Sequence, residues 1–446
     1  MSTPPLQPAA SNTYPPATAS PGARLSLGLL LSINLINYID RYNLSAVEEQ
    51  VRDQFFAKDD PHAKAWMGSL ATAFLVTYML AAPFFGWLAD RARRWLIIGI
   101  GVTLWSLATG ACGLARSFEM LLVCRIFIGI GEAAWGPTAP TIIADMYPVK
   151  KRGAVLAWFN IALSVGSALG FIIGGRVAQA LDWRWAFFVV APPGLILGIW
   201  SLFRKDPPRG MSDAVAPTRR FRWTDLKILV ATPSYLFNTA GMAAMTFAVG
   251  GMSFWMPTYV HEFRMHGDLL TEAGRAAHGH VNTVFGGILV VTGLGGTLAG
   301  GYLADWLRGR QVRGAYFLVS GASMLLAFPF FLGFLFAPFP YAWGLMGVAI
   351  FLIFMSTGPT NTIIANVTPA PIRASAYAFN ILIIHSLGDA ISPPVSGAVS
   401  GMARGNMNVA FGLVGVAMVL AGLVWVLGGR FLDRDTERAP GRMGGT

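Results

Sequence analysis

The feature that most constrains this chain is a series of apolar runs, each long enough to cross a membrane. A helix needs about 20 apolar residues to span a hydrocarbon core roughly 30 Å thick. In lipid, helices satisfy their own backbone hydrogen bonds, so runs of this length predict helices. The sequence therefore predicts an all-α membrane protein with twelve transmembrane helices. The runs are 25–47, 66–89, 95–115, 118–147, 154–180, 184–203, 230–260, 280–304, 314–336, 341–368, 374–400 and 408–431.

The composition agrees with a membrane-embedded chain and argues against other classes. Of 446 residues, 54% are hydrophobic and 12% charged, which is too apolar for a soluble protein of this size. The net charge of +11 comes from short basic tracts between apolar runs, so we expect no nucleic-acid partner. Cys112 and Cys124 both lie inside apolar runs, and we expect no disulfide framework, metal site or cofactor.

The basic tracts also predict the orientation of the chain. Most Lys and Arg residues fall on one side if the N-terminus is inside, as the positive-inside rule requires of cytoplasmic loops. Both termini are then cytoplasmic. We expect a multi-pass protein, which would lie in the inner membrane if the source is bacterial.

An internal repeat divides the chain into two halves. The segment 141–148 (TIIADMYP) recurs as 362–369 (TIIANVTP), and 86–90 (GWLAD) recurs as 301–305 (GYLAD). Parallel halves with a substrate site between them are a common design of secondary transporters. Because no P-loop motif is present, we expect an ion or substrate gradient to drive transport. The predicted units are a disordered cytoplasmic tail (1–24), a six-helix bundle (25–203), a cytoplasmic linker (204–229), a second six-helix bundle (230–432) and a cytoplasmic tail (433–446).

Charged residues inside the apolar runs mark the candidate site. Arg125 and Glu132 are seven residues apart in one run, so they share a helix face. Each charge near a bilayer centre costs about 2.5–3.5 kcal/mol on insertion scales and needs a partner or a watery cavity. Asn34, Asn37 and Arg41 follow i, i+3, i+7 spacing and place a polar stripe on the first run, with Asp40 at its edge. Two interpretations remain open: a static salt bridge of Asp40, or a cavity that binds an anionic headgroup or a proton.

Glu132 is the predicted protonation switch of this cavity. It lies about 10 Å deeper than Arg125, where burial favours the neutral acid and the two arginines favour the carboxylate. Asp40 is the competing candidate. We expect Asp40 to lie beside Arg41 near the outer water, where it stays ionised more easily.

The second half contributes different polar residues to the predicted cavity. His385 and Asp389 are four residues apart, on one helix face. A histidine inside a membrane can also serve only as a hydrogen-bonding residue between helices, so both interpretations remain open. The full second-half set is Asn238, Thr360, Asn361, His385 and Asp389.

Two similar loops are candidates for an inner gate. Each has an aspartate at the end of a run, followed by arginines, and could hold the cytoplasmic side shut through charge pairs. The alternative is that they are solvated turns that only set the topology. The residues are Asp90, Arg91, Arg94, Asp305, Arg308 and Arg310.

These repeats resemble the major facilitator superfamily over about 25–432. Three strings are similar to its spinster branch: 37–41 (NYIDR), 131–145 with its Gly-Glu and APTIIAD, and 385–393 (HSLGDAISP). One departure is Ala92, where the first loop signature usually has glycine. The resemblance implies the major facilitator fold, with twelve transmembrane helices in two six-helix pseudo-repeats.

The resemblance also implies a function. It indicates a secondary active transporter that moves a lysolipid or sphingoid phosphate, an amphipathic lipid-like anion, by alternating access, with a proton or another ion as coupling partner. We expect a monomer in the lipid bilayer and no enzymatic activity. An organic-anion/proton symporter or a multidrug/proton antiporter of the same superfamily is the alternative. A channel or scramblase would need a continuous polar route, and an intramembrane hydrolase would need a nucleophile–base pair that does not stand out here.

Overall fold

The computed structural model describes residues 22–147, 149–207, 225–369 and 372–443, and the described elements are helices without a strand. Most of the predicted N-terminal tail (1–24) and linker (204–229) lies outside these residues, whereas the predicted C-terminal tail (433–446) is described to residue 443 and is helical, because α16 continues to Arg438 and η5 follows it. The prediction of an all-α fold is confirmed. Each predicted run coincides with one helix or with consecutive helices.

The bounds of the helices follow the predicted runs closely in the first half. They are α1 (Ala23–Phe55), α2 (Ala63–Ala89), α3 (Arg94–Gly113), α4 (Phe118–Ala133), α5 (Ala139–Met146), α6 (Val149–Ala180) and α7 (Trp183–Leu202).

In the second half, several runs are divided into consecutive helices. The elements are α8 (Leu226–Val230), α9 (Pro233–Thr258), η2 (Tyr259–Arg264), α10 (Glu272–Gly309), α11 (Ala315–Phe336), α12 (Tyr341–Phe354), α13 (Thr357–Val367), α14 (Arg373–Ile384), η4 (His385–Asp389), α15 (Ser392–Met402), α16 (Met407–Arg438) and η5 (Ala439–Met443).

Eight stretches of described helix are long and apolar enough to cross a membrane by length and composition. The remaining predicted runs correspond to α1, α4–α5, α9 and α14–α15. These are the runs that are interrupted or that contain most of the polar candidate residues. Polar side chains inside a span lower its mean hydropathy, so the least apolar spans are also the ones suited to line a site.

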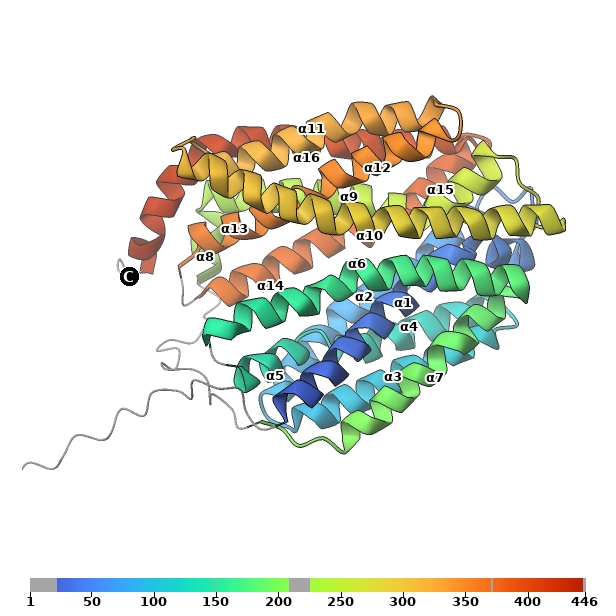
Figure 1. Cartoon of the computed structure of the whole chain (residues 1–446), viewed down its shortest axis with the longest axis horizontal. Helices are drawn as coiled ribbons and strands as arrows, with labels where there is room; N and C mark the ends of the chain where they lie inside the picture. Colours follow the sequence, from blue (N-terminus) through green and yellow to red (C-terminus); the bar gives the residue numbers. More distant parts are fainter. Residues whose placement is uncertain (1–21, 148, 208–224, 370–371, 444–446) are drawn as a thin grey trace, which may run out of the picture.

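The helices form two bundles that correspond to the two predicted halves (Figure 1). In the first, α1 packs on α6 and α3 packs on α7; in the second, α16 packs on both α9 and α11. The halves meet where α6 contacts α10 and where α2 contacts α15. At the second contact, a Cβ on Gly68 would overlap the backbone of Pro393 and Pro394, so glycine allows the helices to approach closely.

We name the two ends of the bundle after the predicted orientation. The inner end holds the α2–α3 connection, and the outer end holds the α1–α2 connection. At the outer end, α1 continues to Phe55, beyond the predicted residue 47, and α10 begins at Glu272, before the predicted residue 280. Hydropathy ends a span at its first cluster of charges, whereas α1 continues because its charges are paired, as described below, and α10 begins where the Thr271 side chain accepts from the Gly274 N–H.

Candidate functional site

A break between α4 and α5 positions Glu132. Pro137 and Pro140 cannot donate backbone hydrogen bonds, so residues 134–138 form turns and α5 begins with Pro140 in its first turn. The Glu132 carbonyl accepts hydrogen bonds from the backbone N–H groups of Trp135 and Gly136. Glu132 therefore lies in the last turn of α4, at a point where the span is interrupted.

The central ion pair of the first half joins α1 to α4. Nη2 of Arg41 donates to Oε2 of Glu132 at 2.7 Å. The Glu132 side chain is 1% exposed and that of Arg41 is 24% exposed, so the acid is enclosed while the arginine reaches an open space. The guanidinium of Arg41 also lies over the Phe74 ring, 4.9 Å from its centroid. If one residue of this pair were lost, the other would keep its charge inside the protein without a partner.

Arg125 also lies over the Phe74 ring, 5.0 Å from its centroid, and is buried. Its Nε and Nη1 atoms are buried and have no hydrogen-bond partner among the described residues. Gly129, one turn further along α4, allows this approach, because a Cβ there would overlap Thr77 and the Phe74 carbonyl. Both guanidinium groups thus lie within about 5 Å of the same aromatic ring, and Arg125 has donors that no described residue satisfies.

Asp40 does not lie near the outer water, and it does not form the salt bridge that the sequence suggested. It is buried, and its Oδ2 accepts a hydrogen bond from Thr109 of α3 at 2.5 Å. One helix position separates Asp40 from Arg41 by about 100°, which turns the acid towards α3 and the arginine towards α4. Asn37 is also buried, and its Nδ2 has no partner among the described residues.

A pocket of about 120 Å³ connects this charged site to the second half. Arg41 and Arg125 line it from the first half, and Asp389 lines it from the second. Most of the other lining residues are apolar, and they include Leu44, Phe74, Leu75, Val249 and Phe254. The pocket therefore combines two cations with apolar walls at the boundary between the bundles.

His385 and Asp389 are brought together as the spacing predicts. Nδ1 of His385 is 2.9 Å from Oδ1 of Asp389, and both side chains are about one-quarter exposed. Gly388 lies between them with a non-helical backbone (φ −106°, ψ −105°), so α14 does not continue regularly into α15. This kink places Asp389 against the pocket while His385 remains its partner.

The other second-half candidates lie away from the pocket lining. Asn238 and Thr360 are fully buried inside the second bundle, where Nδ2 of Asn238 donates to the Thr360 carbonyl at 3.0 Å. Asn361 is exposed and donates to the Thr357 carbonyl. The first contact joins α9 to α13, whereas the second lies within α13, so a role of these three residues in the cavity remains a prediction.

The first candidate gate loop is anchored within its own half. Arg94 is buried and donates to Asp145 of α5 at 2.5 Å, while Asp206 accepts from the backbone N–H of Arg94 at 2.7 Å. Arg91 lies over the Trp87 ring, 4.4 Å from the centroid. Arg94 thus joins the start of α3 to α5 and to the chain that follows α7.

The second loop is arranged similarly. Oδ1 of Asp305 accepts from the Tyr316 hydroxyl at 3.0 Å, and Arg308 pairs with Asp433 of α16 at 2.5 Å. Arg310 stacks over Trp306 at 3.9 Å. These contacts also stay within one half, so the proposed charge pairs across the inner gate remain a prediction for another conformation.

Arg94→Ala is expected to destabilise the folded protein. The substitution would remove the buried ion pair between Arg94 and Asp145 and the bond from Arg94 to the Pro207 carbonyl, and the loss of one partner of a buried pair costs about 3 kcal/mol or more. Thermal unfolding of the purified protein would measure the effect. Arg93→Ala is the matched control, because Arg93 is exposed and its guanidinium donates to the Arg204 carbonyl. Equal stability of both variants would contradict the anchoring role.

Sequence reasoning missed a set of charged residues at the outer end. Glu48, Glu49 and Arg52 continue α1 beyond the predicted span, and His261 and Glu262 follow α9. The available signal was the i, i+4 spacing of Glu48 and Arg52, which favours continued helix. The four ion pairs that join the halves within the described residues all involve this set.

Comparison with known proteins places the chain in a family. The Major Facilitator Superfamily profile matches residues 30–393. Protein spinster homolog 3 of Danio rerio is 34% identical over 421 residues, which cover 91% of this chain and 83% of that protein. Protein spinster homolog 1 of Homo sapiens is 32% identical over 454 residues, covering 94% of this chain and 83% of that protein.

Solved structures share the fold. A bacterial homolog of the human lysosomal transporter spinster, in an inward-facing and occupied conformation, matches with a TM-score of 0.78 and 23% identity, covering 94% of this chain and 99% of that chain. A D-xylose–proton symporter matches with a TM-score of 0.68 and 16% identity, covering 92% of this chain and 97% of that chain. The chain therefore belongs to the spinster proteins of the Major Facilitator Superfamily, and it is a multi-pass membrane transporter and not an enzyme.

Proposed function

We propose that this transporter moves an amphipathic, lipid-like anion, such as a lysolipid or a sphingoid phosphate, by alternating access coupled to protons. The observation that carries the proposal is Arg125. It is buried beside the Arg41–Glu132 pair, it lines a pocket between the halves, and two of its donors have no partner among the described residues. We further propose that the chain works as a monomer with both termini in the cytoplasm.

The charges of the pocket favour an anionic headgroup. Arginine presents a planar fork of donors that matches phosphate and carboxylate oxygens. Nε and Nη1 of Arg125 lack partners among the described residues, and a buried donor without a partner costs about 1–3 kcal/mol. An anion that accepts from one of these donors, together with Nη2, would relieve part of this cost, and its charge would be balanced by the guanidinium.

The walls of the pocket favour an apolar tail. Leu44, Phe74 and Leu75 line it from the first half, and Val249 and Phe254 line it from the second. Each buried CH₂ group contributes about 0.8 kcal/mol to transfer from water. A lysolipid or sphingoid chain would gain from this contact, whereas a sugar would lose hydrogen bonds to water. The pocket volume of about 120 Å³ accommodates a headgroup and the start of a chain, so the halves would have to separate to admit the rest.

The Arg41–Glu132 pair supports proton coupling. While Glu132 is a carboxylate, it holds Arg41 at 2.7 Å and satisfies its charge. Protonation of Glu132 would remove that counter-charge and release Arg41 to bind an anion. Proton and anion would then favour each other's binding, which is the reciprocity that coupled transport requires.

Transport by the purified chain in liposomes tests the proposal. We expect saturable uptake of a lysolipid or sphingosine phosphate that increases with an imposed pH gradient and does not respond to a sodium gradient. The panel should include a short organic anion and a cationic drug, which represent the two alternative substrate classes. Uptake of only the short anion would favour the organic-anion symporter and overturn the lipid assignment.

A further inference from the structure

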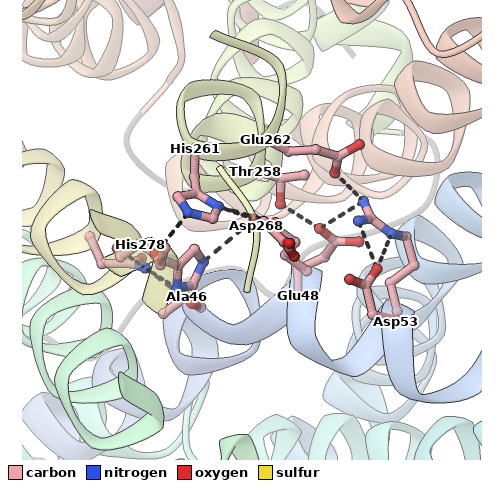
Figure 2. Close-up of polar contacts among 12 residues, drawn as sticks. Ala46, Glu48, Asp53, Thr258, His261, Glu262, Asp268 and His278 are labelled. Atoms are coloured by element: carbon pink, nitrogen blue, oxygen red, sulfur yellow. Dashed lines mark hydrogen bonds and ion pairs between the residues drawn. The ribbon is translucent and has the colours of Figure 1, made fainter. Parts of the chain in front are cut away.

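A buried polar cluster joins the two halves at the outer end (Figure 2). It is formed by the last turns of α1, the first turn of α2, η2 and the first turns of α10. The four ion pairs between the halves that the described residues form all belong to it. It lies beyond Arg41 by about two to three helical turns, so it is separate from the Arg41–Glu132 site.

One arm of the cluster is a network of permanent charges. Arg52 pairs with Glu262 at 2.7 Å, and Lys64 pairs with the same carboxylate at 3.0 Å. Although burial raises the pKa of Glu262, the charges of Arg52 and Lys64 outweigh it and hold this pKa below its usual value. Thr258 donates to the Glu48 carboxylate beside this arm. The arm therefore keeps its charges at neutral pH.

The other arm contains Glu49 and His261, and it requires a proton. Nδ1 of His261 is 3.0 Å from Oε2 of Glu49, and Nε2 is 2.9 Å from the Gly274 carbonyl oxygen. A carbonyl can only accept, so Nε2 carries a hydrogen. A neutral His261 then has a lone pair on Nδ1, which would face the carboxylate oxygens of Glu49. The contact becomes a hydrogen bond only if one more proton sits on Nδ1 or on Glu49.

We propose that Glu49 and His261 form a second proton-binding site, which locks the outer end closed while the proton is bound. The two residues come from different halves, so the shared proton links α1 to η2 across the interface. Loss of this proton would place the Nδ1 lone pair of His261 against the Glu49 carboxylate inside a buried contact. The two groups would repel each other, and the halves would separate there. The proposal rests on alternating access, but it concerns closure of the outer end and not the substrate.

The surroundings of His261 agree with this assignment. His278 of α10 faces it edge-on, with ring centroids 5.2 Å apart, and its Nε2 is 3.9 Å from Glu49. Glu48 and Arg52 of α1, Lys64 of α2 and Glu262 of η2 are the other titratable and charged groups of the cluster. Burial by itself lowers the pKa of His261. The hydrogen bond to Glu49 and the charge of Glu49 outweigh burial, so the pKa of His261 lies above its ordinary value. Closure is thus favoured at low pH and weakened as pH rises through this pKa.

A cavity gives protons access to the cluster from outside. Its volume is about 430 Å³, and Glu49, Arg52 and Glu262 line its floor. Exposed residues of the α1–α2 connection, including Lys58 and Asp59, line its rim. The outer solution can therefore set the occupancy of the site.

Distance measurements between spin labels on opposite halves test the proposal without substrate. Leu181 follows α6 and is 64% exposed, and Met402 ends α15 and is 77% exposed, so both accept a label at the outer end. Cys112 and Cys124 would be replaced by alanine in the background. We expect the closed distance at about pH 5 and a growing open population towards about pH 9, changing by at most about tenfold per pH unit for one proton.

Substitutions separate the proton from simple packing. Glu49→Gln supplies an amide donor to Nδ1, so its outer end should stay closed over the whole pH range. His261→Leu leaves the Glu49 carboxylate without a partner, and its outer end should stay open or lose the pH response. His280→Gln is the matched control, because His280 is exposed on α10 two residues from His278.

Two results would overturn the proposal: distances in the parent that do not change with pH, or a Glu49→Gln variant that opens as the parent does. If His261→Leu does not fold, Glu49→Gln decides alone. Glu132→Gln should keep an outer-end response of the same size. This separates failure of the lock from failure of the proposed proton coupling at Glu132.

Discussion

Arg125→Ala is expected to abolish substrate transport and leave membrane insertion intact. Hydrogen bonds to charged groups contribute about 1.5–3 kcal/mol each, so the loss of two bonds to an anionic headgroup corresponds to about 10²–10⁴-fold weaker binding. Insertion should not suffer, because removal of a charge from the membrane interior relieves a cost. Uptake of a labelled lysolipid into liposomes would measure the effect, together with the amount of protein reconstituted.

Two further variants make this prediction specific. Arg125→Lys should also fail, since a lysine cannot offer the planar pair of donors. Arg116→Ala is the control, because Arg116 is exposed just before α4. Arg41→Ala should abolish transport too, but it leaves the buried Glu132 carboxylate without its partner and so mixes stability with function. Normal uptake by Arg125→Ala would remove this arginine from the mechanism.

Glu132→Gln is expected to bind substrate but to lose the response to a proton gradient. A pH difference of one unit supplies about 1.4 kcal/mol per proton, enough for about tenfold accumulation. The glutamine is permanently neutral and leaves Arg41 without its counter-charge, so binding should no longer depend strongly on pH. The variant should therefore equilibrate substrate to a ratio near one under the same gradient. Binding against pH and pH-driven uptake are the two measurements.

The control for this experiment lies on the same helix. Glu119 is exposed in the first turn of α4, so Glu119→Gln should behave as the parent does. If Glu132→Gln keeps the parent's pH dependence in both assays, the coupling proton binds elsewhere. Asp40 and Asp389 are then the next candidates, since Asp40 is buried beside the site and Asp389 lines the pocket.

Hydropathy located the helices but not their ends. At the outer end, the sequence suggested loops after residue 47 and before residue 280, because charged residues follow or precede the apolar runs there. The helices continue through these charges, since Glu49 and Arg52 find partners on η2. Local hydropathy does not show which residues pair when about 200 positions separate them, so this cluster could not be predicted from the sequence alone.

The sequence by itself determined the all-helical membrane fold, the two related halves and the position of four charges within the apolar runs. These follow from local properties: run length, repeated strings and the cost of a charge in lipid. The tertiary structure decided which charges meet. Arg41 pairs with Glu132, 91 positions away, and Asp40 turns to Thr109 instead. Partner choice depends on the approach of α1 to α3 and α4, which packing alone sets.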